Sequence, residues 1–138
     1  MSAESLMRVR VVRMLRALHA VPVENSVQEG TPDINTVYGW LELKQLPAWP
    51  VRPDTPVGNG LLRPGQGPWL ARRCAHGGAA WVLLRIGREW ILLWGAWAAQ
   101  HLGRTNRKQL VQAAVAYWPT GVVQQQLVEH LTRCSPRS

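Results

Sequence analysis

The stretch Gly30–Lys44, GTPDINTVYGWLELK, carries the strongest signal for the fold. Pro32 cannot donate a hydrogen bond to a β-ladder, so it suits the beginning of a strand. We expect a short strand at Ile34–Val37, a turn at Tyr38-Gly39 and a second strand at Trp40–Leu46, because β-branched and apolar residues flank a turn signal. The stretch therefore predicts a β-hairpin.

Charged side chains gather on this hairpin. Because side chains alternate along a strand, Glu42 and Lys44 share one face with Trp40, whereas Leu43 faces the other way. Pairing of the two strands across the turn would bring Asp33 close to them. The hairpin therefore places two acids and a lysine together.

The competing interpretation is a surface hairpin with a solvated charge pair. Only Lys44 and Lys108 are lysines among the 16 Lys and Arg residues, so an ordinary surface charge here would be expected to be arginine. Lysine is a compact charge whose pKa shifts readily, which favours a chemical role for Lys44.

The arrangement of Asp33, Glu42 and Lys44 resembles the core of the PD-(D/E)xK nucleases. The resemblance implies that Asp33 and Glu42 bind Mg²⁺ or Mn²⁺, together with the backbone carbonyl of Leu43, and that Lys44 helps to activate water. It also implies an α/β fold with a restriction-endonuclease-like core. This core has an N-terminal helix, a β-hairpin in a mixed sheet, a helix and further strands, and here C-terminal helices would follow it.

A longer series of residues is similar to the virus-type replication-repair nuclease (VRR-NUC) branch of that superfamily. The residues that carry this resemblance are Gly30, Pro32, Asp33, Glu42, Lys44, Gln66, Trp69, Leu70, Gly77 and Gly78. It implies that Gln66 supports the active site. Small viral relatives act as homodimers on duplex or branched DNA, including Holliday junctions, so a phage origin is implied as well.

The composition points to a polyanionic partner. The 138-residue chain, long enough for one domain with a core, carries a formal charge of +8. Such a balance favours binding to nucleic acid. Four of the eight acidic residues nevertheless fall within one segment: Glu24, Glu29, Asp33 and Glu42. A basic protein with one acidic focus is what a metal-dependent nuclease needs.

The first predicted helix runs from Ser2 or Ala3 to His19, with Ser2 as its N-cap. Glu4 heads its apolar stripe. A first-turn acid stabilised by the helix dipole is the ordinary explanation, but the resemblance makes Glu4 a candidate metal ligand. Glu24 and Glu29 are its rivals for completing the site.

Arginines offer candidate contacts to DNA. A long Pro- and Gly-rich loop is expected at 47–64, beside the substrate cleft or as a passive linker. Its Arg52 and Arg63 are candidate DNA-binding residues, and so is Arg73 on the helix expected at 64–76.

The rest of the chain is expected to complete the fold. Dense apolar runs predict strands buried on both faces at 80–86 and 89–94. Helices are expected at 97–102, 106–118 and 120–133. We therefore divide the chain into a nuclease core (1–95), a C-terminal helical extension packed on it (96–134) and a disordered tail (135–138).

The sequence contains neither an evident signal peptide nor a stretch apolar enough to span a membrane. Cys74 and Cys134 lack metal-ligand spacing and are expected to be reduced, so we expect a cytoplasmic protein, in the host cell if it is phage-encoded. The expected function is a metal-dependent DNA endonuclease. Two alternatives stay open: a catalytically silent nuclease-fold protein that binds DNA or serves a structural role, and an RNase.

Overall fold

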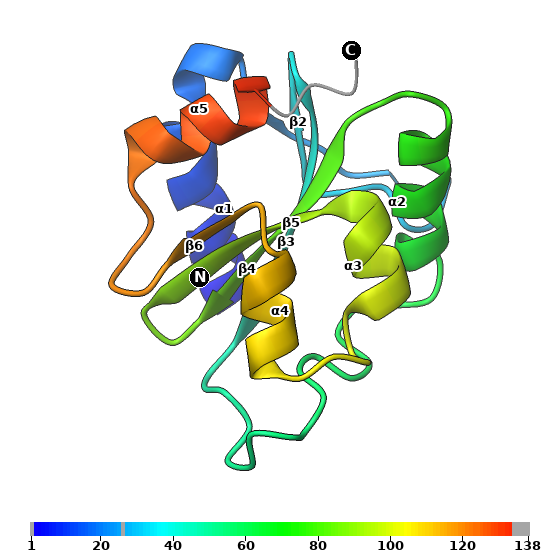
Figure 1. Ribbon diagram of the computed structural model, residues 1–138. Coiled ribbons are helices and arrows are strands. Elements are labelled where there is room, and N and C mark those ends of the chain that lie inside the picture. The colour runs from blue at the N-terminus through cyan, green and yellow to red at the C-terminus, as the bar shows by residue number, and fades with distance from the viewer. Residues whose placement is uncertain (1, 26, 134–138) are drawn as a thin grey trace.

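A computed structural model describes residues 2–25 and 27–133 of the chain (Figure 1). These residues form an α/β fold with a mixed six-stranded sheet. In chain order the elements are α1 (Ala3–Met14), the 3₁₀ turn η1 (Arg16–Leu18), β1 (Val21–Pro22), β2 (Ile34–Thr36), β3 (Gly39–Leu46), α2 (Gln66–Ala75), β4 (Ala80–Ile86), β5 (Glu89–Trp94), α3 (Gly95–His101), α4 (Arg107–Ala113), β6 (Ala116–Trp118) and α5 (Gln124–Arg133).

The strands lie in the sheet in the order in which they occur in the chain, β1 to β6. Only β3 and β4 run parallel, with Trp40 opposite Ala80 and Leu46 opposite Ile86. A parallel pair needs a crossover, and α2 lies within that crossover. In this strand order β3 and β4 occupy the centre of the sheet.

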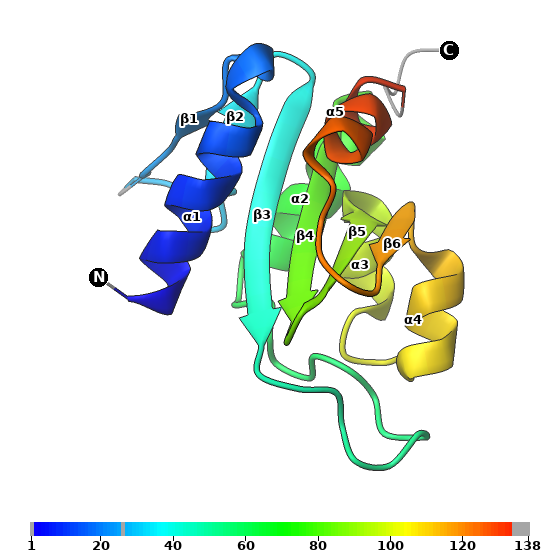
Figure 2. The ribbon, with the colours of Figure 1, turned by 90° about the vertical axis from the view of Figure 1, so that its left-hand side faces the viewer.

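Helices cover both faces of the sheet (Figures 1 and 2). On one face α1 and α5 pack against strand residues such as Leu41, Leu83 and Trp90. On the other face α2, α3 and α4 pack against Val82, Leu84 and their neighbours. The alternation of side chains along each strand thus divides the apolar residues between two cores.

The hairpin and the central strands agree with the sequence prediction. β4 and β5 have the expected bounds, and β4 is buried on both faces. The turn lies one residue earlier than predicted, at Val37 and Tyr38, because Gly39 already belongs to β3. A Cβ atom on Gly39 would lie 2.5 Å from the Ala79 carbonyl oxygen, so only glycine allows this close approach.

The first helix begins where predicted but ends earlier. Ser2 caps it by accepting a hydrogen bond from the Ser5 backbone N–H. The α-helix ends at Met14, and a 3₁₀ turn carries the chain to Leu18. His19 then adopts a left-handed conformation, with φ of 54°, which ends the helical segment.

The prediction of a helix at 106–118 is wrong for the second half of this segment. α4 ends at Ala113, and the Val115 backbone N–H donates to the Leu92 carbonyl. Ala116–Trp118 then forms β6 along the edge of β5. The exposed edge of β5 offers a ladder of hydrogen bonds, which outweighs the helical periodicity of this segment.

The C-terminal part therefore contributes a strand to the sheet as well as helices. α5 begins at Gln124, four residues later than the expected helix. The segment expected to be a tail, 135–138, lies outside the described residues, as does Cys134. Within the described part of the chain no helix has the length and apolar character needed to cross a bilayer.

Candidate functional site

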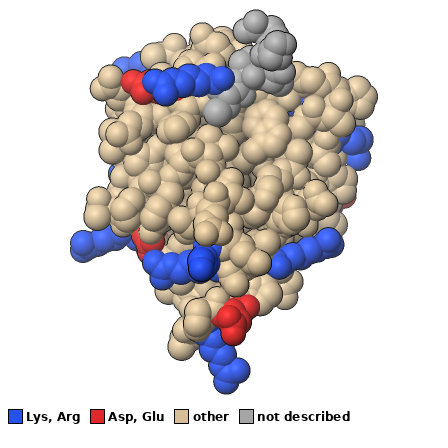
Figure 3. Space-filling view, viewed as in Figure 1, with Lys and Arg blue, Asp and Glu red and all other residues tan. Residues whose placement is uncertain are grey.

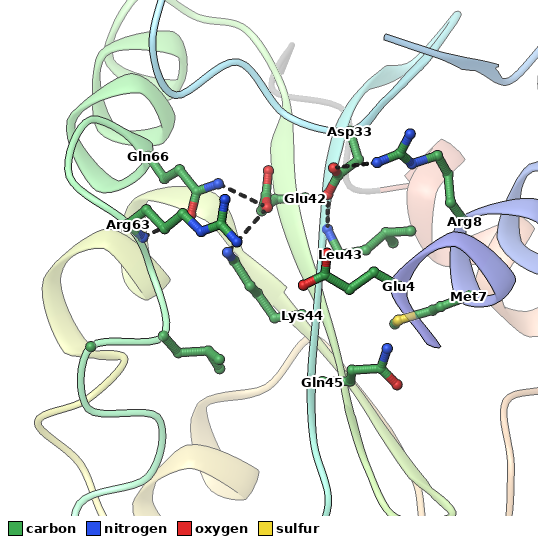
Figure 4. A pocket seen from close by; sticks show the side chains of 12 residues that line it. Glu4, Met7, Arg8, Asp33, Glu42, Leu43, Lys44, Gln45, Arg63 and Gln66 are labelled. Atoms are coloured by element: carbon green, nitrogen blue, oxygen red, sulfur yellow. Dashed lines mark hydrogen bonds and ion pairs between the residues drawn. The ribbon is translucent and has the colours of Figure 1, made fainter. Parts of the chain in front are cut away.

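A cavity of about 280 Å³ opens beside the C-terminal half of β3. Its walls come from the first turns of α1, the end of β3, the residue before β2, the irregular segment before α2 and the first residue of α2. Figure 4 shows Asp33, Glu42, Lys44 and Gln66 turned toward it. These four are the residues that the sequence predicted to form an active site, and the fold brings them together.

The cavity exists because β2 stops short of the end of β3. The two strands pair only from Ile34–Leu41 to Thr36–Gly39. Beyond this ladder, the Leu43 backbone N–H donates a hydrogen bond of 2.9 Å to Asp33 Oδ2. The N–H and carbonyl of one strand residue point to the same side, so the Leu43 carbonyl also faces this open edge.

The same register sets Asp33 against Glu42. Each lies one position beyond the Ile34–Leu41 pair, so the two residues face each other across the end of the ladder. The carboxyl of Asp33 is three-quarters buried, since 26% of its side chain is exposed. Two acidic side chains are therefore held side by side where the sheet opens.

Among the described residues Glu42 is the one buried charged residue, at 3% exposure. Its Oε2 lies 3.6 Å from Lys44 Nζ and accepts a hydrogen bond of 3.2 Å from Gln66 Nε2. Burial raises the pKa of Glu42 from 4.5 to about 8, helped by the charge of Asp33, while the charge of Lys44 opposes the shift. A second positive charge beside Glu42, in addition to Lys44, would favour the ionised form of the Glu42 carboxyl.

Gln66 holds the start of α2 against the site. Its Oε1 accepts a hydrogen bond of 2.8 Å from the Arg63 backbone N–H, while its Nε2 reaches Glu42. The helix tolerates Gly67 and Pro68 because both lie in its first turn, where the backbone N–H groups have no helical partner.

The loop before β2 packs tightly against the same helix end. A Cβ atom on Gly30 would lie 2.3 Å from the Gly65 carbonyl oxygen, and both glycines have positive φ. Larger residues would push the segment that carries Asp33 away from α2. The close contact between Gly30 and Gly65 thus explains why the predicted motif has a glycine at position 30.

Of the three acids considered for completing the site, Glu4 alone lines the cavity. It projects from the first turn of α1 toward β3 (Figure 4). Glu24 is 89% exposed and lies 3.7 Å from Arg8 Nη1. Glu29 packs against Gly65 and does not line the cavity.

The three candidate DNA-binding arginines lie in different places. Arg63 lines the cavity, and Arg52 is exposed without lining it. Arg73 lies at the far end of α2, with its guanidinium 4.6 Å from the ring centre of Trp69 and 5.6 Å from that of Trp40. The face of the molecule in Figure 3 carries only scattered Lys and Arg, chiefly around its margin.

The segment 47–64 is irregular as predicted, but it is anchored. Val57 is fully buried and exchanges backbone hydrogen bonds of 2.8 Å with Thr105 and Gly103. Trp49 donates its indole N–H to Glu89, beside Arg107. The C-terminal part of the chain thus holds the segment that delivers Arg63 to the cavity.

Two polar side chains of the cavity were not predicted from the sequence. Arg8 Nη2 lies 3.7 Å from Asp33 Oδ1. Gln45 also lines the cavity, and its Nε2 is buried with no hydrogen-bond partner among the described residues. The sequence did contain a signal for Arg8. It lies four residues after Glu4, and this spacing places both side chains on one face of the helix.

The donor set suits a hard divalent cation. Among the described residues no three His, Cys, Asp or Glu side chains are grouped to hold a metal ion. The site offers instead two carboxylates, from Asp33 and Glu42, and the Leu43 carbonyl. Mg²⁺ is commonly held by one or two carboxylates and several waters, and it would relieve the unfavourable burial of the Glu42 charge.

No protein-family model matches the chain, and no significant match is found among curated proteins.

Proposed function

We propose that the chain is a metal-dependent nuclease that hydrolyses phosphodiester bonds in DNA, with the PD-(D/E)xK arrangement that its sequence resembles. The single observation that supports this most strongly is the buried carboxyl of Glu42. It faces Asp33 in a solvent-connected cavity and has Lys44 and Gln66 against one oxygen. Burying an acid beside another acid is unfavourable. Such an arrangement is typical of functional sites.

In this proposal Asp33, Glu42 and the Leu43 carbonyl hold Mg²⁺ or Mn²⁺, and Glu4 reaches the same cavity. When bound, the cation polarises the scissile phosphate and lowers the pKa of a coordinated water. Gln66 keeps Glu42 Oε2 in position through its hydrogen bond of 3.2 Å.

Lys44 is the residue proposed to act on the reacting atoms. Its side chain is 11% exposed, and its ammonium group lies beside Glu42 at the cavity. There it would orient the attacking water and stabilise the negative charge that develops on the phosphate oxygens. Arg63, which also lines the cavity, would hold the phosphodiester.

A plasmid-nicking assay tests the proposal. We expect nicking of supercoiled DNA with Mg²⁺ or Mn²⁺, and none with EDTA or with the Glu42→Gln variant. Binding to DNA without nicking in either metal would favour the silent DNA-binding protein. Cleavage of RNA but not DNA under the same conditions would favour an RNase.

The form of the substrate is proposed on the resemblance alone. One chain supplies one such cavity, so cutting two strands together favours a two-fold homodimer. A panel of linear, flapped and four-way DNA tests whether branched DNA is preferred. Light scattering at micromolar concentration tests the dimer, and a monomer mass with and without DNA would contradict it.

A further inference from the structure

Arg8 connects the cavity to the protein surface. Its Nη2 lies 3.7 Å from Asp33 Oδ1, and its Nη1 lies 3.7 Å from Glu24 Oε1. It lines the same cavity as Asp33 (Figure 4). The guanidinium of Arg8 therefore lies between Asp33, which is mostly buried, and Glu24, which is exposed.

The guanidinium is loosely held. Both separations are ion-pair distances longer than hydrogen bonds, and neither has the paired geometry of a strong arginine–carboxylate contact. The side chain is 31% exposed. It can therefore leave Asp33 at small cost, and Glu24, at 89% exposure, offers it another partner.

Asp33 presents its two oxygens to different partners. Oδ2 is occupied by the Leu43 backbone N–H at 2.9 Å, whereas Oδ1 faces Arg8. A cation approaching Asp33 from the cavity must therefore compete with Arg8 for the charge of this carboxylate. On the other side of the site, Lys44 plays the equivalent part for Glu42 at 3.6 Å.

We propose that Arg8 is a displaceable counter-charge of the nuclease site, a role that rests on the proposed function. It neutralises Asp33 before a divalent cation binds, and it turns to the phosphodiester of the substrate once the cation has taken Asp33. A guanidinium released beside the cavity is suited to this second role, because it offers several fixed donors to phosphate oxygens. Arg8 would then weaken metal binding and strengthen substrate binding.

The two halves of the proposal predict opposite effects of one substitution. Arg8→Gln removes the competing charge, so Mn²⁺ should bind about three- to fivefold more tightly, the range expected for a partly exposed ion pair. The same variant should bind DNA more weakly. General damage to the site would instead weaken both affinities.

Arg13→Gln is the matched control. Arg13 lies on the same helix, is exposed, and does not line this cavity. The Arg13→Gln substitution removes the same charge as Arg8→Gln, so it measures how much DNA affinity is lost through general electrostatic attraction alone. Arg8→Lys is the second variant, since it keeps the charge if Arg8→Gln does not fold.

Free Mn²⁺ is measured by its electron paramagnetic resonance signal during titration into wild type, Arg8→Gln, Arg8→Lys and Arg13→Gln. Affinity for a labelled DNA duplex is measured by fluorescence anisotropy with Ca²⁺. We expect Arg8→Gln to gain the most Mn²⁺ affinity and Arg13→Gln to gain none. Arg8→Gln should also lose at least about threefold more DNA affinity than Arg13→Gln. Arg8→Lys should lie between wild type and Arg8→Gln in both measurements.

Unchanged or weaker Mn²⁺ binding in Arg8→Gln would overturn the counter-charge role. Tighter Mn²⁺ binding with DNA affinity equal to that of Arg13→Gln would overturn the transfer to phosphate. Wild type that binds no Mn²⁺ at all would instead refute the proposed metal-dependent function, so the two failures are distinguishable.

Discussion

Asp33, the residue before β2, accepts a hydrogen bond of 2.9 Å from the Leu43 backbone N–H, so an acidic side chain satisfies the part of β3 that β2 does not reach. The contact fixes the carboxylate of Asp33 beside Glu42, at the edge of β3 that the short β2 leaves open. Asp33 therefore has a structural role, as hydrogen-bond acceptor for Leu43, and a proposed chemical role, as a charged ligand. A substitution can change one of these roles and keep the other.

Replacing Asp33 by Asn separates these roles. Asn keeps an oxygen that can accept from Leu43 but removes the charge that repels ionised Glu42. In EDTA at pH 9 we expect a gain in stability of roughly 1 kcal/mol, because the lost ion pair with partly exposed Arg8 is worth little. Cleavage should be lost.

Thermal melts of wild type and Asp33→Asn, each in EDTA and in excess Mg²⁺, measure this effect. Mg²⁺ should stabilise wild type by binding only to the folded state, and the variant much less. Equal shifts in both proteins would show that Asp33 is not a metal ligand.

Stability should depend on pH through Glu42. In the unfolded chain this carboxyl has its ordinary pKa of 4.5, and in the folded protein its pKa is about 8. Between these values the folded state holds a proton that the unfolded state has lost. Stability in EDTA should therefore fall as the pH rises from 4.5 to 8, by up to about 5 kcal/mol, and then level off with respect to this group.

Glu42→Gln tests that assignment. The amide cannot ionise, so urea unfolding at pH 5, 6.5, 8 and 9 should lack the part of the decline that Glu42 causes. Glu129→Gln is the control, because Glu129 is a surface acid in α5 with an ion pair to Arg133. If wild type and Glu42→Gln lose stability in parallel across this range, another group is responsible.

Replacing Lys44 by Ala should abolish cleavage while leaving most of the DNA affinity. The many arginines supply the attraction to phosphate, whereas Lys44 acts at the reacting atoms, where loss of one stabilising donor costs about 10²-fold or more in rate. Nicking rates and anisotropy titrations on the same preparations give the comparison. A loss of affinity as large as the loss of rate would make Lys44 a binding residue.

Arg63 and Arg52 form a matched pair on one irregular segment. Arg63 lines the cavity and Arg52 does not. Arg63→Gln should therefore reduce kcat/KM by about tenfold, as expected for loss of a charge-assisted contact to phosphate. Arg52→Gln should change only the general salt-dependent attraction. Cleavage rates at two salt concentrations distinguish the two, and equal effects would place neither arginine at the scissile phosphate.

Local sequence patterns were enough to predict the elements around the site. The alternation of Trp40 to Lys44 and the turn before it gave the strand that carries Glu42, and the apolar runs at 80–86 and 89–94 gave its buried neighbours. These patterns are local, so each segment carries its own signal of periodicity and turn formation.

How these residues meet depends on long-range packing. The register of β2 against β3 places Asp33 opposite Glu42, and the packing of α1 brings Arg8, which no motif singles out, to 3.7 Å from Asp33. Helical periodicity at 106–118 gave way to β6 because the edge of β5 offered backbone partners. Such outcomes depend on contacts between segments distant in the chain, and no local pattern of residues encodes their register or depth of burial.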